Sequence, residues 1–321
     1  MKILTVSGSP HVHAPQTVSK IMYGVVISLI PAMLVSFYFF GLQAILVTMV
    51  AVISCLGFEY LFQYVLQGKN FGRPYSIFDG SGMITGILLA FNVPSNIPLW
   101  MVVVGSLVAI GIGKMTFGGL GKNVFNPALV GRVFMLISFP VQMTRWPVPT
   151  KFSTALTDVI TGPTPLAIIK EGIKKGDSLD SLMSQVPDYV NLLMGNMGGS
   201  LGEISAIAII IGGLYMLIRR IITWHIPVAF LGSAAIFSGI LWLVDPTIYV
   251  DPAFHLLTGG MMLGAVYMAT DMVTSPMAKS GQLIFGAGCG LLTITIRVFG
   301  AYPEGVSFAI LIMNAFVPLI N

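Results

Sequence analysis

The 321-residue sequence is poor in charged residues, and this scarcity excludes a soluble globular protein. Only 9% of the residues are charged, whereas soluble domains carry about 25%. Hydrophobic residues make up 55%, and the mean hydropathy is +0.90. The chain is therefore interpreted as a bundle of membrane-spanning helices, each of about 20 apolar residues. A formal net charge of +4 fits lysines and arginines beside anionic lipid headgroups better than it fits nucleic-acid binding.

Cysteine and histidine are also scarce, which argues against a metal centre. The two cysteines, Cys55 and Cys289, lie in apolar runs far apart, so small packing residues are favoured over a disulfide. His11 and His13 have no carboxylate or thiol nearby, and we expect this N-terminal arm to lie against the membrane surface or a neighbour. The apolar run from Ile21 is long enough for a retained span, and no cleavable signal is apparent.

Apolar runs predict about ten membrane spans. The third and eighth runs are short and glycine-rich, which is typical of broken or tilted helices. The expected fold is an all-α polytopic membrane protein with short or broken central helices. The runs cover residues 21–40, 43–66, 78–92, 97–113, 124–143, 203–218, 224–244, 255–270, 282–298 and 305–320.

Two similar segments indicate an internal repeat. DGSGMITGILLAFNVPSN at 79–96 can be aligned with LTGGMMLGAVYMATDMVTS at 257–275, and each joins a small-residue helix to a polar break. Five spans separate the copies, and this odd number predicts two inverted five-helix repeats. Alternatively, glycine-rich membrane helices resemble each other without being repeats. The predicted parts are an arm (1–20), a first repeat (21–143), an outer loop (144–202) and a second repeat (203–321).

The basic residues predict the orientation of the chain. Alternate short loops carry lysine or arginine and the intervening ones do not, apart from Arg297 at the edge of the last outer loop. This bias predicts a cytoplasmic N-terminus and places loop 144–202 on the outer side; long loops such as this one are exempt from the rule. The basic residues of the predicted cytoplasmic loops are Lys69, Arg73, Lys114, Lys122, Arg219, Arg220 and Lys279.

Four charged residues fall in or beside the predicted spans, where each costs about 2.5–3.5 kcal/mol to insert. They are Glu59, Asp79, Arg132 and Asp271. A buried carboxylate either binds or gates a small cation, or forms an ion pair with Arg132, and the sequence leaves both possibilities open. Glu59, Asp79 and Asp271 are therefore candidates for an ion pathway.

A glycine-rich stretch, GKMTFGGLGKNVFNPALVG at 113–131, precedes the fifth run. Its glycines, including Gly119, predict a flexible or tightly turned loop. Asn126 followed by Pro127 is typical of a helix N-cap and first helical residue. The free amides at such an N-terminus can bind a phosphate or a flavin carbonyl. A compact loop without a ligand fits the same residues and is the simpler interpretation.

The outer loop contains TDVITGPTPL at 157–166, in which polar residues have a distinctive order. A turn explains Gly162 and the prolines, but it does not explain Asp158 followed by Thr161 and Thr164.

Three segments of the chain resemble the D subunits of Rnf complexes, and are similar to the related B subunits of the sodium-translocating NADH:quinone oxidoreductase. The resemblance extends over essentially the whole chain, and the glycine-rich loop ending in FNPA is its most specific part. The segments are SPHVHAPQTVSKIMYGVVISLIPA at 9–32, FDGSGMITGILLAFNVP at 78–94 and FGGLGKNVFNPALVGRVF at 117–134.

The resemblance implies a covalent flavin. Members of this family carry flavin mononucleotide (FMN), joined by a phosphoester bond to a threonine in a motif of the form D-x-x-(S/T)-G-A-(S/T). Asp158, Thr161, Gly162 and Thr164 fill the matching positions, so Thr164 is implied to carry the FMN. Pro163 replaces the usual alanine, removes a backbone donor and fixes φ, which puts recognition by the flavin transferase in doubt. That enzyme acts on the outer side, in agreement with the predicted orientation.

The resemblance also implies a function. The chain would be a flavoprotein subunit of a complex in the cytoplasmic (inner) membrane that couples electron transfer between reduced ferredoxin and NAD to Na⁺ or H⁺ translocation. Its partners would be the A, B, C, E and G subunits, the flavin transferase and membrane lipid. A noncovalent riboflavin is implied as well, with Gly119 and Asn126 as candidate contacts. No metal site and no catalytic residue are assigned to this chain.

Two other functions remain open at this stage. Urea-channel-like permeases are also built as inverted five-plus-five bundles, and fold alone does not decide function. A scaffold subunit without a cofactor is the third possibility. The order of Asp158, Thr161–Gly162 and Thr164 favours the flavoprotein, because a permease has no need of it.

Overall fold

The computed structural model describes residues 17–67, 76–149, 161–203 and 205–321. Most of the predicted N-terminal arm, with His11 and His13, lies outside these residues, and so does Asp158. The described chain is helical apart from two short strands, β1 (Trp146–Pro147) and β2 (Thr161–Gly162), which pair antiparallel.

The first half of the chain begins with a long helical element that is really two helices. Within α1 (Val18–Gln67), Gly41 has φ 62° and ψ −143°, a conformation that glycine adopts without the steric penalty of a side chain. The two parts correspond to the first two predicted spans. The elements that follow are η1 (Ser76–Asp79), α2 (Ser81–Phe91), α3 (Leu99–Ile110), η2 (Gly111–Met115), α4 (Pro127–Ser138) and α5 (Pro140–Met143).

The connection between the halves folds into three short helices, and the second half follows with a broken central helix. The connecting helices are α6 (Pro165–Lys175), α7 (Leu179–Met183) and α8 (Tyr189–Met194). The second half contains α9 (Ala206–Ile218), α10 (His225–Val244), α11 (Pro252–Leu257), α12 (Met261–Leu263), η3 (Gly264–Met268), α13 (Lys279–Phe299) and α14 (Val306–Ile320).

Both central helices are short, as predicted. With 11 residues, α2 is about 16 Å long at 1.5 Å per residue, roughly half of the hydrocarbon thickness of about 30 Å. In the second half, Gly259 and Gly260 interrupt the helix with φ values of 63° and 65°. A left-handed glycine also precedes α2, where Gly80 has φ 87°. The two segments thus begin alike, each after a left-handed glycine.

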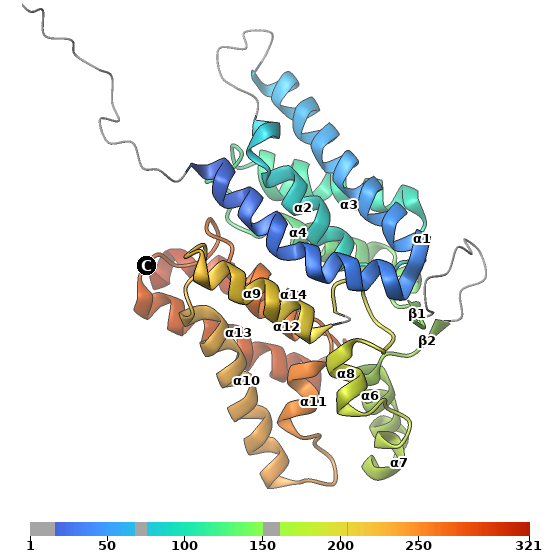
Figure 1. Ribbon diagram of the computed structural model, residues 1–321. Helices are drawn as coiled ribbons and strands as arrows, with labels where there is room; N and C mark the ends of the chain where they lie inside the picture. The colour runs from blue at the N-terminus through green and yellow to red at the C-terminus, as the bar shows by residue number, and fades with distance from the viewer. Residues whose placement is uncertain (1–16, 68–75, 150–160, 204) are drawn as a thin grey trace, which may run out of the picture.

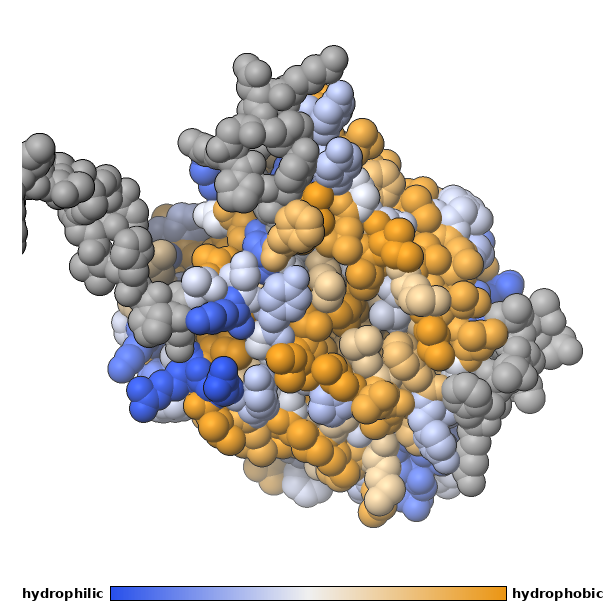
Figure 2. Space-filling view, turned by 45° about the horizontal axis from the view of Figure 1, so that its top comes forward, coloured by the Kyte–Doolittle hydropathy of each residue, from blue (hydrophilic) through white to orange (hydrophobic). Residues whose placement is uncertain are grey.

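The membrane class of the fold is confirmed by helix length and composition. Val18–Val65, His225–Val244 and Lys279–Phe299 are long and apolar enough to cross a membrane, and five shorter apolar helices accompany them in the described chain. Large apolar side chains point outward, among them Ile218 and Leu243, at 79% and 76% exposure. Figure 2 shows a surface dominated by hydrophobic residues. The arrangement of ten spans in two inverted repeats stays a prediction.

The two halves lie side by side, with the connecting helices at one end. In Figure 1, α1–α4 form the upper layer, α9–α14 form the lower layer, and α6–α8 lie together beside the strands. A single apolar core joins the layers and includes Leu89, Phe91, Leu129, Leu263 and Phe285. A second, smaller core lies beneath α6–α8 and is built by Leu166, Ile169, Leu182, Leu192 and Phe254, among others. The connecting region is therefore a packed structure of its own.

Candidate functional site

Thr164 is the N-cap of α6. Its Oγ1 accepts a hydrogen bond from the amide of Ala167 at 3.2 Å, and Pro165 is the first helical residue. Threonine followed by proline is favoured at this helix boundary, since the hydroxyl satisfies a free amide and proline needs none. The side chain of Thr164 is only 4% exposed. The hydroxyl named by the flavin motif thus lies at the N-terminus of an eleven-residue helix.

The preceding residues are fixed by the small sheet. Gly162 pairs with Trp146, and Thr161 pairs with Pro147. Thr161 is exposed, in contrast to Thr164. Pro163 lies between the strand and the N-cap, so the amide that it lacks is not one of the free amides of α6. The substitution of alanine by proline in the motif therefore leaves this helix N-terminus intact.

Lys170 attaches α6 to the membrane part. Its Nζ donates to the backbone carbonyls of Arg297 and Tyr302 at 2.9 and 2.7 Å, and to that of Ile296 at 3.4 Å. These carbonyls lie at the C-terminal end of α13 and just beyond it, where cationic groups are stabilised. Burial, followed by the charge of Lys174, lowers the pKa of Lys170 to about 8. The helix that carries Thr164 is thus bound to the end of a membrane helix.

Glu59 and Asp79, predicted as ion-pathway candidates, are brought together by two other residues. Lys114 Nζ lies 2.6 Å from Glu59 Oε1 and donates to Ser81 Oγ at 2.6 Å. Ser81 in turn donates its hydroxyl to Asp79 Oδ1, and its backbone amide donates to the same oxygen at 2.7 Å. We call Glu59, Lys114, Ser81 and Asp79 the Lys114 cluster. Gly82 permits its close packing, because a Cβ there would lie 2.3 Å from Glu59 Oε2.

An ion pair between Arg132 and Glu59, one of the two possibilities that the sequence leaves open, is not formed: Arg132 pairs with Glu304 and also donates to Ser307. The charge pattern predicts Lys114 in a cytoplasmic loop, but this residue lies in the π-helical turn η2 with 2% exposure. The apolar residues around it in GIGKM are the sequence signal that indicates burial. Turns of this type are common at functional sites.

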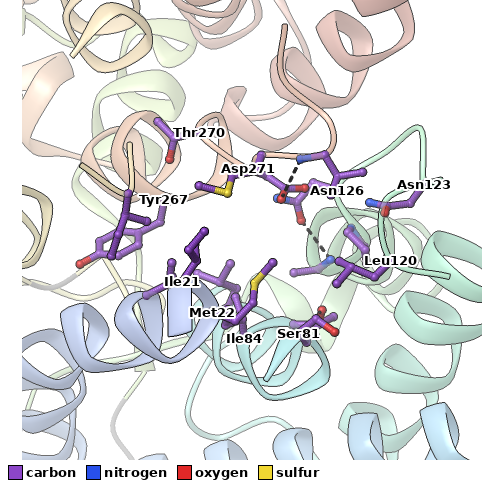
Figure 3. A pocket seen from close by; sticks show the side chains of 18 of the residues that line it. Ile21, Met22, Ser81, Ile84, Leu120, Asn123, Asn126, Tyr267, Thr270 and Asp271 are labelled. Atoms are coloured by element: carbon purple, nitrogen blue, oxygen red, sulfur yellow. Dashed lines mark hydrogen bonds between the residues drawn. The ribbon is translucent and has the colours of Figure 1, made fainter. Parts of the chain in front are cut away.

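A cavity lies between the two halves of the chain beside the Lys114 cluster. Its empty volume is about 750 Å³, including the part open to solvent. Figure 3 shows side chains from both halves around it. The polar residues that line it are Ser81, Thr85, Lys114, Asn123 and Asn126 from the first half, and Tyr267, Thr270 and Asp271 from the second.

Asn126 is the N-cap predicted from the sequence and also joins the halves. Its Oδ1 accepts from the amides of Ala128 and Leu129 at 3.1 and 3.3 Å. Its Nδ2 donates to the carbonyl of Met268 at 3.2 Å. Gly119 does not line the cavity; it has φ 91° in the turn whose Leu120 does. The predicted N-cap is confirmed, and Gly119 shapes the loop without lining the cavity.

Asp271 lies on the opposite side of the cavity from the Lys114 cluster. Its Oδ2 accepts from the hydroxyl of Thr274 at 3.0 Å, and its Oδ1 accepts weakly from the amide of Val273 at 3.5 Å. All three predicted ion-pathway carboxylates thus border the cavity or reach it through Ser81 and Lys114.

A second group of buried charges does not follow from the sequence patterns. Arg132 and Glu304 form its ion pair, and Arg297 donates to the carbonyls of His255, Thr258 and Gly259 at 2.6–2.8 Å. Glu203 completes the group, with 7% exposure. Glu203 and Glu304 escape sequence reasoning because each lies at the boundary of a predicted span, where a charge is usually solvated.

Comparison with known proteins gives a match over nearly the whole chain. The model of the NQR2, RnfD, RnfE family matches residues 5–321. The D subunit of the Na⁺-translocating ferredoxin:NAD⁺ oxidoreductase complex of Acetobacterium woodii is 45% identical, with 99% of this chain and 92% of the relative covered. The D subunit of the proton-translocating ferredoxin:NAD⁺ oxidoreductase complex of Clostridium ljungdahlii is 42% identical, with 99% and 94% covered. The D subunit of the ion-translocating oxidoreductase complex of Stutzerimonas stutzeri is 40% identical, with 95% and 90% covered.

Proposed function

This chain belongs to the NQR2, RnfD, RnfE family, and on that premise we propose that it is the flavoprotein membrane subunit of an Rnf-type complex. The complex couples electron transfer between reduced ferredoxin and NAD to the translocation of Na⁺ or H⁺. Its A, B, C, E and G subunits are the partners of this chain, together with the flavin transferase and membrane lipid. The names of relatives at 40–45% identity support the assignment.

The residues around Thr164 fit a covalently attached FMN. A phosphate esterified to Oγ1 would lie at the N-terminus of α6, where free amides and the helix dipole favour negative charge. The amides nearest to it belong to Leu166 and Ala167, since Pro165 has none, and the Ala167 amide already donates to Oγ1. The flavin, when bound, supplies the redox chemistry, and the chain positions it and tunes its potential. The proposal depends on this observation, the position of the Thr164 hydroxyl at the N-terminus of α6.

Attachment requires Thr164 to become accessible to the transferase. Its side chain is almost fully buried, and its hydroxyl already accepts a hydrogen bond from the Ala167 amide. The oxygen keeps acceptor capacity in a phosphoester, so this N-cap bond is compatible with the modified residue. We therefore propose that the transferase acts while the N-terminus of α6 is locally open.

The covalent site is tested with two threonine variants of the full chain, co-expressed with a flavin transferase. Thr164→Ala should abolish in-gel flavin fluorescence of the denatured protein. Thr161→Ala is the matched control, because it changes the same residue type three positions earlier, and it should retain a fluorescent band. A band of wild-type intensity from Thr164→Ala would refute the assignment. A dark wild-type band from competent cells would favour a permease or a cofactor-free scaffold.

The cavity between the halves is the proposed site for the noncovalent riboflavin. The edge of a flavin ring carries hydrogen-bond donors and acceptors, and the cavity offers matching groups on Asn123 and Asn126. Asn123 Oδ1 is buried and has no hydrogen-bond partner among the described residues. Such an unsatisfied acceptor is costly unless another group donates to it.

The Lys114 cluster and Asp271 are the proposed ion-pathway residues. Ser81, Lys114 and Asp271 line one cavity at the contact between the two halves, and Glu59 and Asp79 are joined to it through Lys114 and Ser81. Transporters with inverted repeats hold their coupling ions at such a place. Similar relatives are named for Na⁺ in one case and for protons in the other, so overall identity does not select the ion. Asp79→Asn should reduce ion transport by the assembled complex while leaving its covalent flavin content unchanged. Undiminished transport would remove Asp79 from the pathway.

We propose that the chain lies in the cytoplasmic membrane, with its N-terminus inside and α6–α8 outside. Three basic residues from the predicted cytoplasmic loops support this orientation: Arg219 and Arg220 follow α9, and Lys279 begins α13. Cysteine accessibility tests it: a cysteine introduced at exposed Glu171 should react with an impermeant thiol reagent in intact cells. Labelling only after permeabilisation would reverse the orientation.

A further inference from the structure

Residues 200–203 enter the bundle at the end of the short helix α2. The amide of Gly202 donates to the carbonyl of Phe91 at 2.9 Å, and the amide of Leu201 donates to that of Val93 at 3.3 Å. Gly202 allows this approach, because a Cβ there would lie 2.5 Å from Phe91 Cβ. The segment thus satisfies the carbonyl of Phe91, which α2 leaves free at its C-terminus, and that of Val93 just beyond it. Glu203 is the last residue of this segment.

Glu203 also lies against the break in the second central helix. A Cβ on Gly260 would be 3.0 Å from Glu203 Oε1, so the carboxylate packs directly on the left-handed glycine that precedes α12. A Cβ on the neighbouring Gly259 would be 2.8 Å from Arg297 Nη2. A single carboxylate thus lies where the interrupted helices of both halves meet.

The charged groups around Glu203 come from three parts of the chain. Arg132 of α4, Arg297 of α13 and Glu304, in the segment before α14, interact with it electrostatically. His255 of α11 interacts with Arg297. The sequences of α2 and α12 contain no titratable residue. Two positive and two negative groups are therefore gathered in a buried place, beside one histidine.

Neither arginine is bound directly to Glu203. Arg132 pairs with Glu304, and Arg297 donates through Nη1 and Nη2 to three backbone carbonyls. The ion pairs of the described chain, Lys114–Glu59 and Arg132–Glu304, do not include Glu203. Its carboxylate accepts a weak hydrogen bond from the amide of Ser200 at 3.5 Å.

We propose that Glu203 is a proton-binding residue that takes up and releases a proton beneath α6–α8. An ionised carboxylate without a direct partner is costly to bury, and this cost favours the protonated form. The nearby charges of Arg132 and Arg297 favour the ionised form. Because burial and the two arginines act in opposite directions, the protonated and ionised forms of Glu203 are close in free energy. Reversible proton exchange requires this. The carboxyl gains or loses only the proton, which it exchanges with water.

A proton is favoured over a metal cation at this position. Hard cations are bound by several oxygen ligands, but the carbonyls of Thr258 and Gly259 at the break already accept hydrogen bonds from Arg297. The Arg297 guanidinium thus already binds the carbonyl oxygens that a metal cation would need as ligands. Glu203 does not line the cavity and is distinct from the Lys114 cluster and Asp271. Proton binding by Glu203 does not depend on the proposed function; only a role of this proton in ion translocation rests on it.

The test is an infrared pH titration of the full chain in lipid nanodiscs, with Glu203→Gln compared against Glu171→Gln. Glu171 is an exposed residue of α6, so its variant removes one carboxyl from the surface. The wild type and Glu171→Gln should show a titrating band of a buried protonated carboxyl, equivalent to about one proton per chain. Glu203→Gln should lose that band. An unchanged band in folded Glu203→Gln would overturn the proposal.

Two further arms complete the test. If Glu203→Gln does not fold, Glu203→Asp should move the titration midpoint of the same band, and an unmoved midpoint would overturn the proposal. Replacing choline by Na⁺ in the buffer should leave the midpoint unchanged, whereas a Na⁺-dependent midpoint would identify a metal-cation site and refute proton selectivity. Covalent flavin is scored separately by gel fluorescence. Failure of the flavin proposal is thereby distinguished from failure of this one.

Discussion

Lys114 and Glu59 form a buried ion pair, in which Nζ lies 2.6 Å from Oε1 and the side chains are 2% and 0% exposed. The pair joins η2 to the second part of α1, between residues 55 positions apart in sequence. Ser81 extends it to Asp79. Each charge at this depth depends on the other, because burying either one without its partner is strongly destabilising.

Breaking this pair from one side should destabilise the protein. Lys114→Met leaves the Glu59 carboxylate without its cation, and we expect a loss of about 3–5 kcal/mol in the free energy of unfolding. The double variant Glu59→Leu/Lys114→Met removes both charges and should be more stable than Lys114→Met alone. Thermal unfolding of the purified variants in detergent measures both effects. A Lys114→Met protein within about 1 kcal/mol of the wild type would contradict the account.

Close packing of α2 on α1 depends on Gly86. A Cβ at this position would lie 2.7 Å from Val52 Cα and 2.9 Å from Val52 N, and this backbone has little freedom to move. Gly86→Ala should therefore destabilise the fold by about 1–3 kcal/mol through overpacking. Gly57→Ala is the control, because Gly57 lies in α1 with no atom within 4 Å of the added Cβ. Equal unfolding temperatures for the two variants would refute the predicted contact.

The depressed pKa of Lys170 predicts a pH dependence of stability. The pKa is about 8 in the folded protein and 10.5 in the unfolded chain. Between these values the unfolded chain binds more protons, so the contribution of Lys170 to stability should rise as pH increases from about 8 to 10.5. Thermal unfolding across this range should show the rise in the wild type relative to Lys170→Met. Parallel curves for the two proteins would contradict the assignment.

Asn126 should affect the noncovalent flavin more than the covalent one. Asn126→Ala removes the N-cap of α4, at a cost of about 0.5–2 kcal/mol, as well as the bond to the Met268 carbonyl. Asn126→Asp keeps the capping oxygen but replaces the amide donor with a second carboxyl oxygen. We expect less riboflavin in acid extracts of both variants, with gel fluorescence of the covalent flavin retained. Full riboflavin content in Asn126→Ala would remove this residue from the site.

The local features of the fold could be predicted from the sequence, and the tertiary pairing of charges could not. Apolar runs locate the helices, and the Asn126–Pro127 step locates the N-terminus of α4, because both signals depend on neighbouring residues. The sequence leaves the partner of Glu59 open, since Lys114 comes into contact with it only when η2 packs on α1. Glu203 could not be predicted because its burial arises from contacts with α2 and with the glycine break, both distant in sequence.

For the candidate site as well, the order of the residues could be predicted from the sequence and their packing could not. The motif residues Thr161, Gly162 and Thr164 are recognised by their order, but their difference in exposure is set by the pairing of β2 with β1 and by the start of α6. The cavity is made by residues from both halves, so its lining depends on how the halves pack.

The central claim is that Thr164 carries FMN, and peptide mass spectrometry of the wild-type protein tests it most directly. The protein is purified after co-expression with a flavin transferase, and the peptide covering residues 152–170 is fragmented. We expect an added FMN mass located on Thr164, with Thr161 unmodified. An unmodified peptide from transferase-competent cells, or a flavin located on another residue, would refute the assignment of FMN to Thr164.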